Sequence, residues 1–122
     1  MNLKESPEDY LETILILSDK SENVRSVDIA AHLGFSKPSV SVAMKKLRES
    51  SLISMDPYGK VSLTSEGRAI AEKVYERHQV ISGLLMRIGV SRENALNDAC
   101  RIEHVISDEA FDRLREIHQK ND

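Results

Sequence analysis

Hydrophobic residues in this chain recur mainly every three or four positions, which is the spacing of one face of an amphipathic helix. The stretch SPEDYLETILIL begins with Ser6 at a helix N-cap and Pro7 at the first helical position. Its apolar residues Leu11, Ile14 and Leu15 share one face. The sequence therefore predicts a first helix from Pro7 onward.

Two shorter helical segments follow, separated by a glycine. We expect Ser26 to cap the segment VDIAAHL, which Gly34 ends. The apolar stripe of this segment comprises Val27, Ile29, Ala30 and Leu33. A second segment starts at Ser36 and has Pro38 in its first turn, where a missing N–H group does no harm. Two short helices joined by a tight glycine-containing turn predict a helix-turn-helix motif.

The pattern then changes to two short β-prone runs, LIS and VSLT, on either side of the turn residues DPYG. A hairpin after a helix-turn-helix is a wing. The run from Glu66 to Ile88 has no proline and predicts one helix of about 20 residues. Ser91 and Ser107 are expected to cap two further helices. The predicted fold is mainly α, with a winged helix-turn-helix domain over residues 1–72 and an all-helical domain over residues 73–122.

Composition limits the possible partners. The net charge of −3 over 122 residues excludes a protein that coats nucleic acid by bulk charge, so any such contact requires a local basic patch. The charged start and the lack of an apolar run of roughly 20 residues predict a cytoplasmic protein with no membrane partner. A single cysteine, Cys100, cannot form an intrachain disulfide, which fits a reducing compartment.

A local basic patch lies in the segment from Lys37 to Lys60, which holds five basic residues against two acidic ones. Lys37, Ser41 and Lys45 form an i, i+4 row away from the apolar stripe of the second short helix. Any solvated helix face carries such residues, but their place in a winged motif favours DNA binding. The predicted DNA-contacting residues are Ser36, Lys37, Pro38, Ser39, Ser41, Lys45, Lys46, Tyr58 and Lys60.

Candidate chemistry gathers around the cysteine. Cys100, Glu103 and His104 are spaced i, i+3 and i+4, so a helix would place all three on one face. Each alone has an ordinary explanation: a buried thiol, an exposed acid, or a core histidine. Together they supply thiolate, carboxylate and imidazole, the main ligand classes for first-row divalent metals. The spacing therefore predicts a metal site.

Three ligands seldom complete such a site, and two further candidates come from elsewhere in the chain. Asp9 and Glu12 are spaced i, i+3 on the first helix, where acids are also favoured by the helix dipole. His78 interrupts the apolar stripe of the long helix.

The chain resembles the diphtheria-toxin-repressor family of metal-dependent transcriptional repressors. The resemblance is carried by the order of SVDIAAHLGFSKPSVSVAMKKL, LTSEG, ERH and IEH, and it is strongest for the short manganese transport regulator branch. It implies a dimerisation domain in the C-terminal half, a homodimer on palindromic double-stranded operator DNA, and no enzyme activity. It implies one metal held by Asp9, Cys100, Glu103 and His104, and a second by Glu12, His78 and the shared Glu103.

One position departs from the branch. The manganese regulators typically carry a glutamate where this chain has Cys100, whereas the iron-sensing relatives carry cysteine there; Asp9 follows the manganese pattern. Carboxylates suit Mn(II), and a thiolate favours the softer Fe(II), Co(II) or Zn(II). We expect Mn(II) or Fe(II) as the corepressor, with Co(II) or Zn(II) binding in vitro.

Two alternatives remain at this point. A winged-helix regulator could respond to a small organic ligand or to oxidation of Cys100, and its DNA binding would not depend on metal. A small metallohydrolase could use Glu103 as a base on a metal-bound water. A chain of this length, with a DNA-reading half, leaves little room for a substrate pocket, so no organic substrate is expected.

Overall fold

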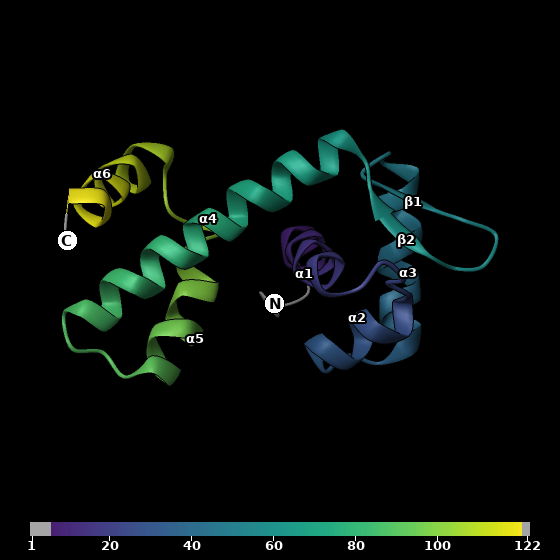
Figure 1. Ribbon diagram of the computed structural model, residues 1–122, viewed down its shortest axis with the longest axis horizontal. Helices are drawn as coiled ribbons and strands as arrows, with labels where there is room; N and C mark the ends of the chain where they lie inside the picture. Colours follow the sequence, from purple (N-terminus) through teal and green to yellow (C-terminus); the bar gives the residue numbers. More distant parts are fainter. Residues whose placement is uncertain (1–5, 121–122) are drawn as a thin grey trace. The chain divides into compact units, whose positions relative to one another are not determined.

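Helices account for most of residues 6–120, which are the residues that the structure, a computed structural model, describes. The elements, in chain order, are α1 (Pro7–Lys20), α2 (Ser26–Leu33), α3 (Lys37–Glu49), β1 (Ile53–Met55), β2 (Val61–Leu63), α4 (Ser65–Arg87), α5 (Arg92–Ile102) and α6 (Asp108–Lys120) (Figure 1). The predicted mainly α fold with an N-terminal winged helix-turn-helix is confirmed. The predicted caps Ser6, Ser36 and Ser91 stand at their helix starts.

Two compact units divide the chain, Met1–Glu72 and Lys73–Asp122, and α4 runs through the boundary between them. The first unit contains the predicted winged motif, and the second contains α5, α6 and most of α4. Within residues 6–120, no helix combines the length and the apolar character needed to cross a bilayer.

The first unit is held together by the apolar faces of its three helices. Leu11 and Ile14 of α1, Ile29 of α2, and Val40 and Met44 of α3 are almost fully buried. Gly34 ends α2 with a positive φ of 75°, a left-handed conformation that glycine adopts without steric penalty. This residue makes the tight turn between α2 and α3.

The start of α2 differs from the prediction. The N-cap is Arg25, and Ser26 is the first helical residue, so the predicted Ser26 cap was wrong by one position. The reason is local: the carboxylate of Asp28 accepts a hydrogen bond of 2.9 Å from the N–H of Arg25, which closes the helix one residue earlier. The predicted apolar stripe also included Val27, which is 48% exposed.

The wing is an antiparallel hairpin of β1 and β2 whose loop is ordered by one aspartate. The carboxylate of Asp56 accepts hydrogen bonds from the N–H groups of Tyr58 (2.9 Å) and Lys60 (2.8 Å). The guanidinium of Arg25 donates to the carbonyl oxygen of Tyr58. These contacts tether the wing to the start of α2.

Gly67, in the first turn of α4, lies against the end of the hairpin's entry segment. A Cβ at this position would meet the carbonyl oxygen of Leu52 at 2.0 Å. Gly67→Ala should therefore destabilise the first unit by about 1–3 kcal/mol, because a backbone carbonyl cannot move aside as a side chain can. Urea unfolding followed by circular dichroism measures the effect. The neighbouring exposed Glu66→Ala is the matched control, and equal stability of the two variants would contradict the prediction.

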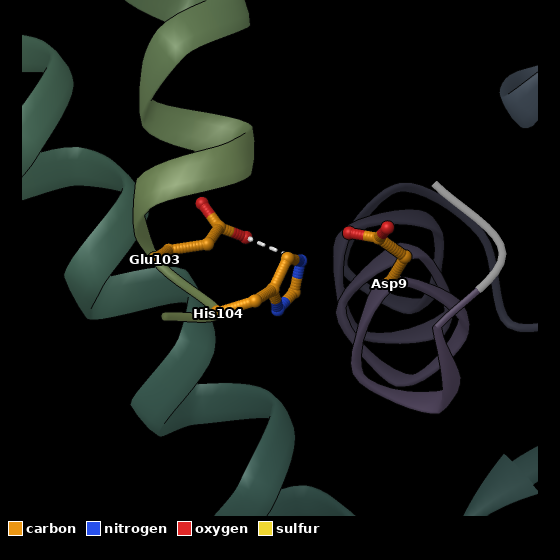
Figure 2. Close-up of side chains that lie close together, drawn as sticks. All are labelled: Asp9, Glu103 and His104. Carbon is orange, nitrogen blue, oxygen red and sulfur yellow. Dashed lines mark ion pairs between the residues drawn. The ribbon is translucent and has the colours of Figure 1, made fainter. Parts of the chain in front are cut away.

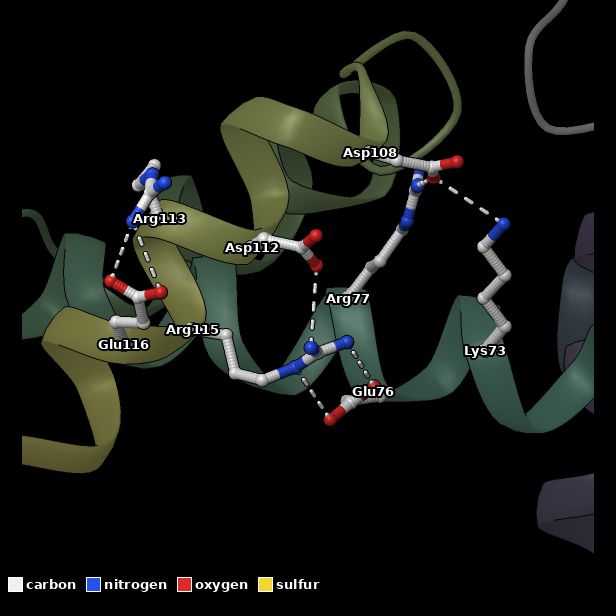
Figure 3. Close-up of polar contacts among 8 residues, drawn as sticks. All are labelled: Lys73, Glu76, Arg77, Asp108, Asp112, Arg113, Arg115 and Glu116. Atoms are coloured by element: carbon white, nitrogen blue, oxygen red, sulfur yellow. Dashed lines mark hydrogen bonds and ion pairs between the residues drawn. The ribbon is translucent and has the colours of Figure 1, made fainter.

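The second unit is built around a small apolar cluster of Val80, Ile81, Ala99 and Phe111. Among the described residues, three ion pairs join α4 to α6 in addition to this cluster (Figure 3). The first is between Glu76 and Arg115, with a distance of 3.1 Å, the second is between Arg77 and Asp108, and the third is between Lys73 and the same Asp108, at 3.4 Å. Each helix contributes both an acidic and a basic residue to these pairs. The pairing of opposite charges fixes the register of α6 on α4.

Candidate metal centre and nucleic-acid interface

Glu103 is the centre of a carboxylate and imidazole cluster in the second unit. Its side chain is fully buried, its Oε1 lies 2.9 Å from His78 Nδ1, and its Oε2 lies 3.7 Å from His104 Nε2. Figure 2 shows Glu103 and His104 side by side, joined by that ion pair, and also draws Asp9 on α1. The structure therefore brings Glu103, His78 and His104 together in the second unit, and their role as metal ligands stays a prediction.

Glu103 and His104 lie just beyond the end of α5. This corrects the prediction that both share one helical face with Cys100. α5 ends at Ile102, and Glu103 and His104 occupy the turn that follows. The N–H of Glu103 still donates to the carbonyl of Ala99 at 2.9 Å, so the turn continues the helix path for one residue.

Arg77 holds this turn and was not identified from the sequence. Its guanidinium donates to the carbonyl oxygens of Glu103 (3.2 Å) and Ile106 (3.1 Å), and it pairs with Asp108. The side chain is only 10% exposed. The available signal was its position: Arg77 lies three residues after Val74 and four before Ile81, on the stripe that faces the interior. A charged residue on a buried stripe requires partners.

Cys100 is half-buried on the last turn of α5. It lies outside the groups of close potential ligand atoms to which Glu103, His78 and His104 belong. The structure of the second unit therefore presents carboxylate and imidazole as the main donors, and ligation by the Cys100 thiol stays a prediction.

Asp9 and Glu12 lie on α1 in the first unit and are buried, with 4% and 8% exposure. This burial does not fit acids whose role is only to face solvent at a helix start. Burying an ionised carboxylate is unfavourable unless a partner or a cation compensates for the lost hydration. Ligation of a metal by Asp9 and Glu12 stays a prediction.

The donor set around Glu103 fits a divalent cation. Within residues 6–120, Oε2 of Glu103 is a buried oxygen without a hydrogen-bond partner. A buried acceptor in that state carries a desolvation penalty of about 1–3 kcal/mol or more. A cation at this oxygen would remove the penalty, and the adjacent imidazoles are the second ligand class that manganese, iron, cobalt and zinc accept.

The predicted DNA-contacting face of α3 is exposed. Val40, Met44 and Leu47 are buried on the opposite side of the helix. The exposed residues at the start and along the outer face are Ser36, Lys37, Pro38, Ser39, Ser41, Lys45 and Lys46. In the wing, Tyr58 is 78% exposed, whereas Lys60 is half-buried. Val42 is also exposed, at 55%, and was not predicted as a DNA contact because it is apolar.

A winged helix-turn-helix in one unit and a buried carboxylate and imidazole cluster in the other define a DNA-binding regulator that responds to metal. Two family models support this class. Residues 2–61 match the iron dependent repressor N-terminal DNA binding domain, and residues 64–121 match the iron dependent repressor metal binding and dimerisation domain.

Known relatives narrow the class further. The chain is 41% identical over 118 residues to the transcriptional regulator MntR of Escherichia coli O6:H1, covering 97% of this chain and 76% of the relative. It is 36% identical over 114 residues to the HTH-type transcriptional regulator MntR of Geobacillus kaustophilus, covering 93% and 81%. The chain belongs to the diphtheria-toxin-repressor family, in its manganese transport regulator branch.

Solved structures agree with this placement. The structure of the manganese regulator SloR superposes with a TM-score of 0.85 at 30% identity, over 95% of this chain and 54% of that chain. This chain therefore spans about half the length of that protein. The resemblance inferred from the sequence is confirmed, and the relatives are transcriptional regulators rather than enzymes.

Proposed function

We propose that this chain represses transcription by binding operator DNA as a homodimer when Mn(II), or alternatively Fe(II), is bound. The observation that carries the proposal is the buried Glu103 carboxylate between two imidazoles, in a chain whose other unit exposes a basic helix. Membership of a family of metal-dependent repressors supports the same function. It also disfavours the alternative of an organic effector or an oxidised cysteine.

The proposed metal ligands are Asp9, Glu12, His78, Cys100, Glu103 and His104. Asp9, Glu103 and His104, with the side chain or carbonyl of Cys100, would hold one ion, and Glu12, His78 and the shared Glu103 a second. The assignment follows the family resemblance. It is supported by the contacts of Glu103 with both histidines. Retention of the carboxylates Asp9 and Glu12 favours Mn(II) as the corepressor. Cys100 makes Fe(II) the second candidate.

Ligands from both units give the proposed site its regulatory effect. When bound, the ion supplies positive charge that offsets the buried carboxylates of α1 and of the turn after α5. The ligands thereby restrict how the DNA-reading unit is presented. If the restricted arrangement has the higher affinity for DNA, metal shifts the population toward it. Metal and DNA must then raise each other's affinity by the same factor.

The DNA contacts follow from α3. Lys37, Lys45 and Lys46 place ammonium groups for phosphates along the exposed side of the helix. The serine hydroxyls at the helix start and Pro38 are also exposed, and Tyr58 and Lys60 would extend the DNA-contacting surface into the wing. A symmetric dimer presents two such helices to half-sites about one helical turn apart, which predicts a palindromic operator. Genes for metal uptake are the proposed targets.

The test is DNA binding by fluorescence anisotropy, using a duplex selected from random sequence by the full chain in the presence of metal. Mn(II), Fe(II), Co(II) and Zn(II) are titrated in turn under anaerobic conditions, followed by a chelator. We expect affinity to rise sharply with Mn(II) or Fe(II) and to collapse when the chelator is added. Binding that is indifferent to both would contradict the proposal and favour an organic effector.

Exchange of the cysteine tests whether the thiol is a ligand. Cys100→Ser should lower the affinity for Zn(II) and Co(II) by about tenfold and that for Mn(II) by less, because a thiolate prefers the softer ions. Cys100→Glu should shift preference toward Mn(II). Competition with a fluorescent chelator measures each affinity. Asn97→Ser, at an exposed position of α5, is the control. Unchanged preference and affinity in both cysteine variants would exclude direct ligation by the side chain.

A further inference from the structure

An exposed valine lies among the residues of α3 that are proposed to contact DNA. Val42 is 55% exposed, whereas Val40 and Met44 on the same helix are 0% and 1% exposed. On a helix, the neighbours of a surface residue are those three and four positions away. For Val42 these are Pro38, Ser39, Lys45 and Lys46, all of which are exposed.

The surroundings of Val42 differ from those of a scattered surface valine. An exposed valine alone needs no explanation. Here the four helix neighbours of the valine are two lysines, one serine and one proline, on the second helix of a helix-turn-helix motif, and the valine also lines a hollow with Pro7 and Tyr10 of α1. The second helix of this motif enters the major groove. The cationic neighbours suit phosphates, and the apolar centre suits an apolar feature of the bases between them.

The major groove offers one apolar feature at the base edges, the 5-methyl group of thymine. The isopropyl group of Val42 has no donor or acceptor, so it cannot read any other base edge by hydrogen bonding. We propose that Val42 is a specificity-determining residue that contacts a thymine methyl group in each half of the operator. This inference rests on the proposed function, because it requires sequence-specific DNA binding through α3.

Replacing thymine by deoxyuridine removes the methyl group and leaves base pairing intact, which isolates the contact. The operator selected by the full chain with Mn(II) is scanned by symmetric exchange of each thymine for deoxyuridine. One thymine position per half-site should lower wild-type affinity by about fourfold, or about 15-fold for the two halves together, since a buried methyl group contributes on that order.

Three variants make the assignment to Val42 specific. Val42→Ala should bind the thymine operator about as weakly as the wild type binds the deoxyuridine operator, and it should show no further loss on the exchange. Val42→Thr, which keeps one methyl group, should retain part of the sensitivity. Val27→Ala, at an exposed valine of α2, should behave as the wild type. Thermal unfolding checks that the variants are folded, as expected for exposed positions.

Two results would overturn the inference and leave the proposed function standing. In the first, no exchange of thymine for deoxyuridine lowers the affinity of the wild type. In the second, each exchange lowers the affinity of Val42→Ala as much as that of the wild type. A chain that selects no DNA sequence at all would overturn the proposed function and this inference with it. That outcome is distinguishable because no operator would emerge from the selection.

Discussion

Replacing Glu103 by glutamine is expected to abolish metal-dependent DNA binding while leaving the metal-free fold intact. The carboxylate is the group that both histidines contact, with Oε1 2.9 Å from His78 and Oε2 3.7 Å from His104. Glutamine has nearly the same shape and keeps a hydrogen-bond acceptor, but it carries no charge for a cation. The proposed sharing of Glu103 between two ions makes this the single exchange with the largest effect on metal affinity.

Unfolding with and without metal gives the quantitative form of this prediction. A ligand that binds only the folded state at 100 times its dissociation constant stabilises it by about 2.7 kcal/mol. The wild type should therefore gain about that much free energy of unfolding at the corresponding Mn(II) concentration, and Glu103→Gln should gain almost none. Without metal the variant should be about as stable as the wild type, because glutamine keeps a hydrogen-bond acceptor for His78 and removes a charge whose burial is unfavourable.

The matched control is Glu109→Gln, which removes an exposed carboxylate from the first turn of α6 and should leave the metal effect unchanged. Loss of stability in the metal-free Glu103→Gln variant, with metal stabilisation retained, would show that Glu103 is a structural partner of His78 and not a ligand. The proposed function would then lose the observation that carries it.

The helix boundaries were predictable from local chemistry because capping depends on residues adjacent in sequence. Ser6 and Ser36 accept hydrogen bonds from the N–H groups of Asp9 and Ser39, as serine caps do. The one-residue error at α2 has the same origin, since Ser26 and Arg25 compete for the cap and the Asp28 carboxylate decides between them. Local signals therefore determine that a helix starts, and side-chain contacts determine the residue.

The candidate site was only partly predictable, because its shape depends on contacts between distant residues. Spacing placed Cys100, Glu103 and His104 on one helical face, yet α5 ends at Ile102. The turn that follows is held by Arg77, a residue 26 positions from Glu103 in sequence. No periodicity argument could anticipate that hydrogen bond. The candidate ligands were identified from the family resemblance. The structure adds the hydrogen bonds from Arg77 to the turn that carries Glu103 and His104.

Replacing Arg77 by methionine is expected to destabilise the second unit by about 3 kcal/mol. The guanidinium donates to the carbonyls of Glu103 and Ile106 and lies 5.3 Å from the ring centroid of Phe111. Methionine keeps the packing of the alkyl stem but leaves two carbonyls without this donor, and each unsatisfied buried group contributes about 1–3 kcal/mol. The pair with Asp108 adds less, since that carboxylate is 74% exposed.

The same variant should weaken metal binding, because Arg77 orients the turn that presents Glu103 and His104. Loss of a residue that supports ligands typically lowers metal affinity by about 10–100-fold.

Urea unfolding and chelator competition measure the loss of stability and the loss of metal affinity. Arg113→Met is the matched control, because its guanidinium pairs with Glu116 at 3.1 Å on the surface of α6, and it should change stability by about 0.5 kcal/mol or less. If Arg77→Met loses stability but binds metal as the wild type does, the arginine holds α4 to α6 and the ligand turn keeps its geometry without it. If both affinity and stability match those of Arg113→Met, the hydrogen bonds to the turn contribute nothing that water cannot replace.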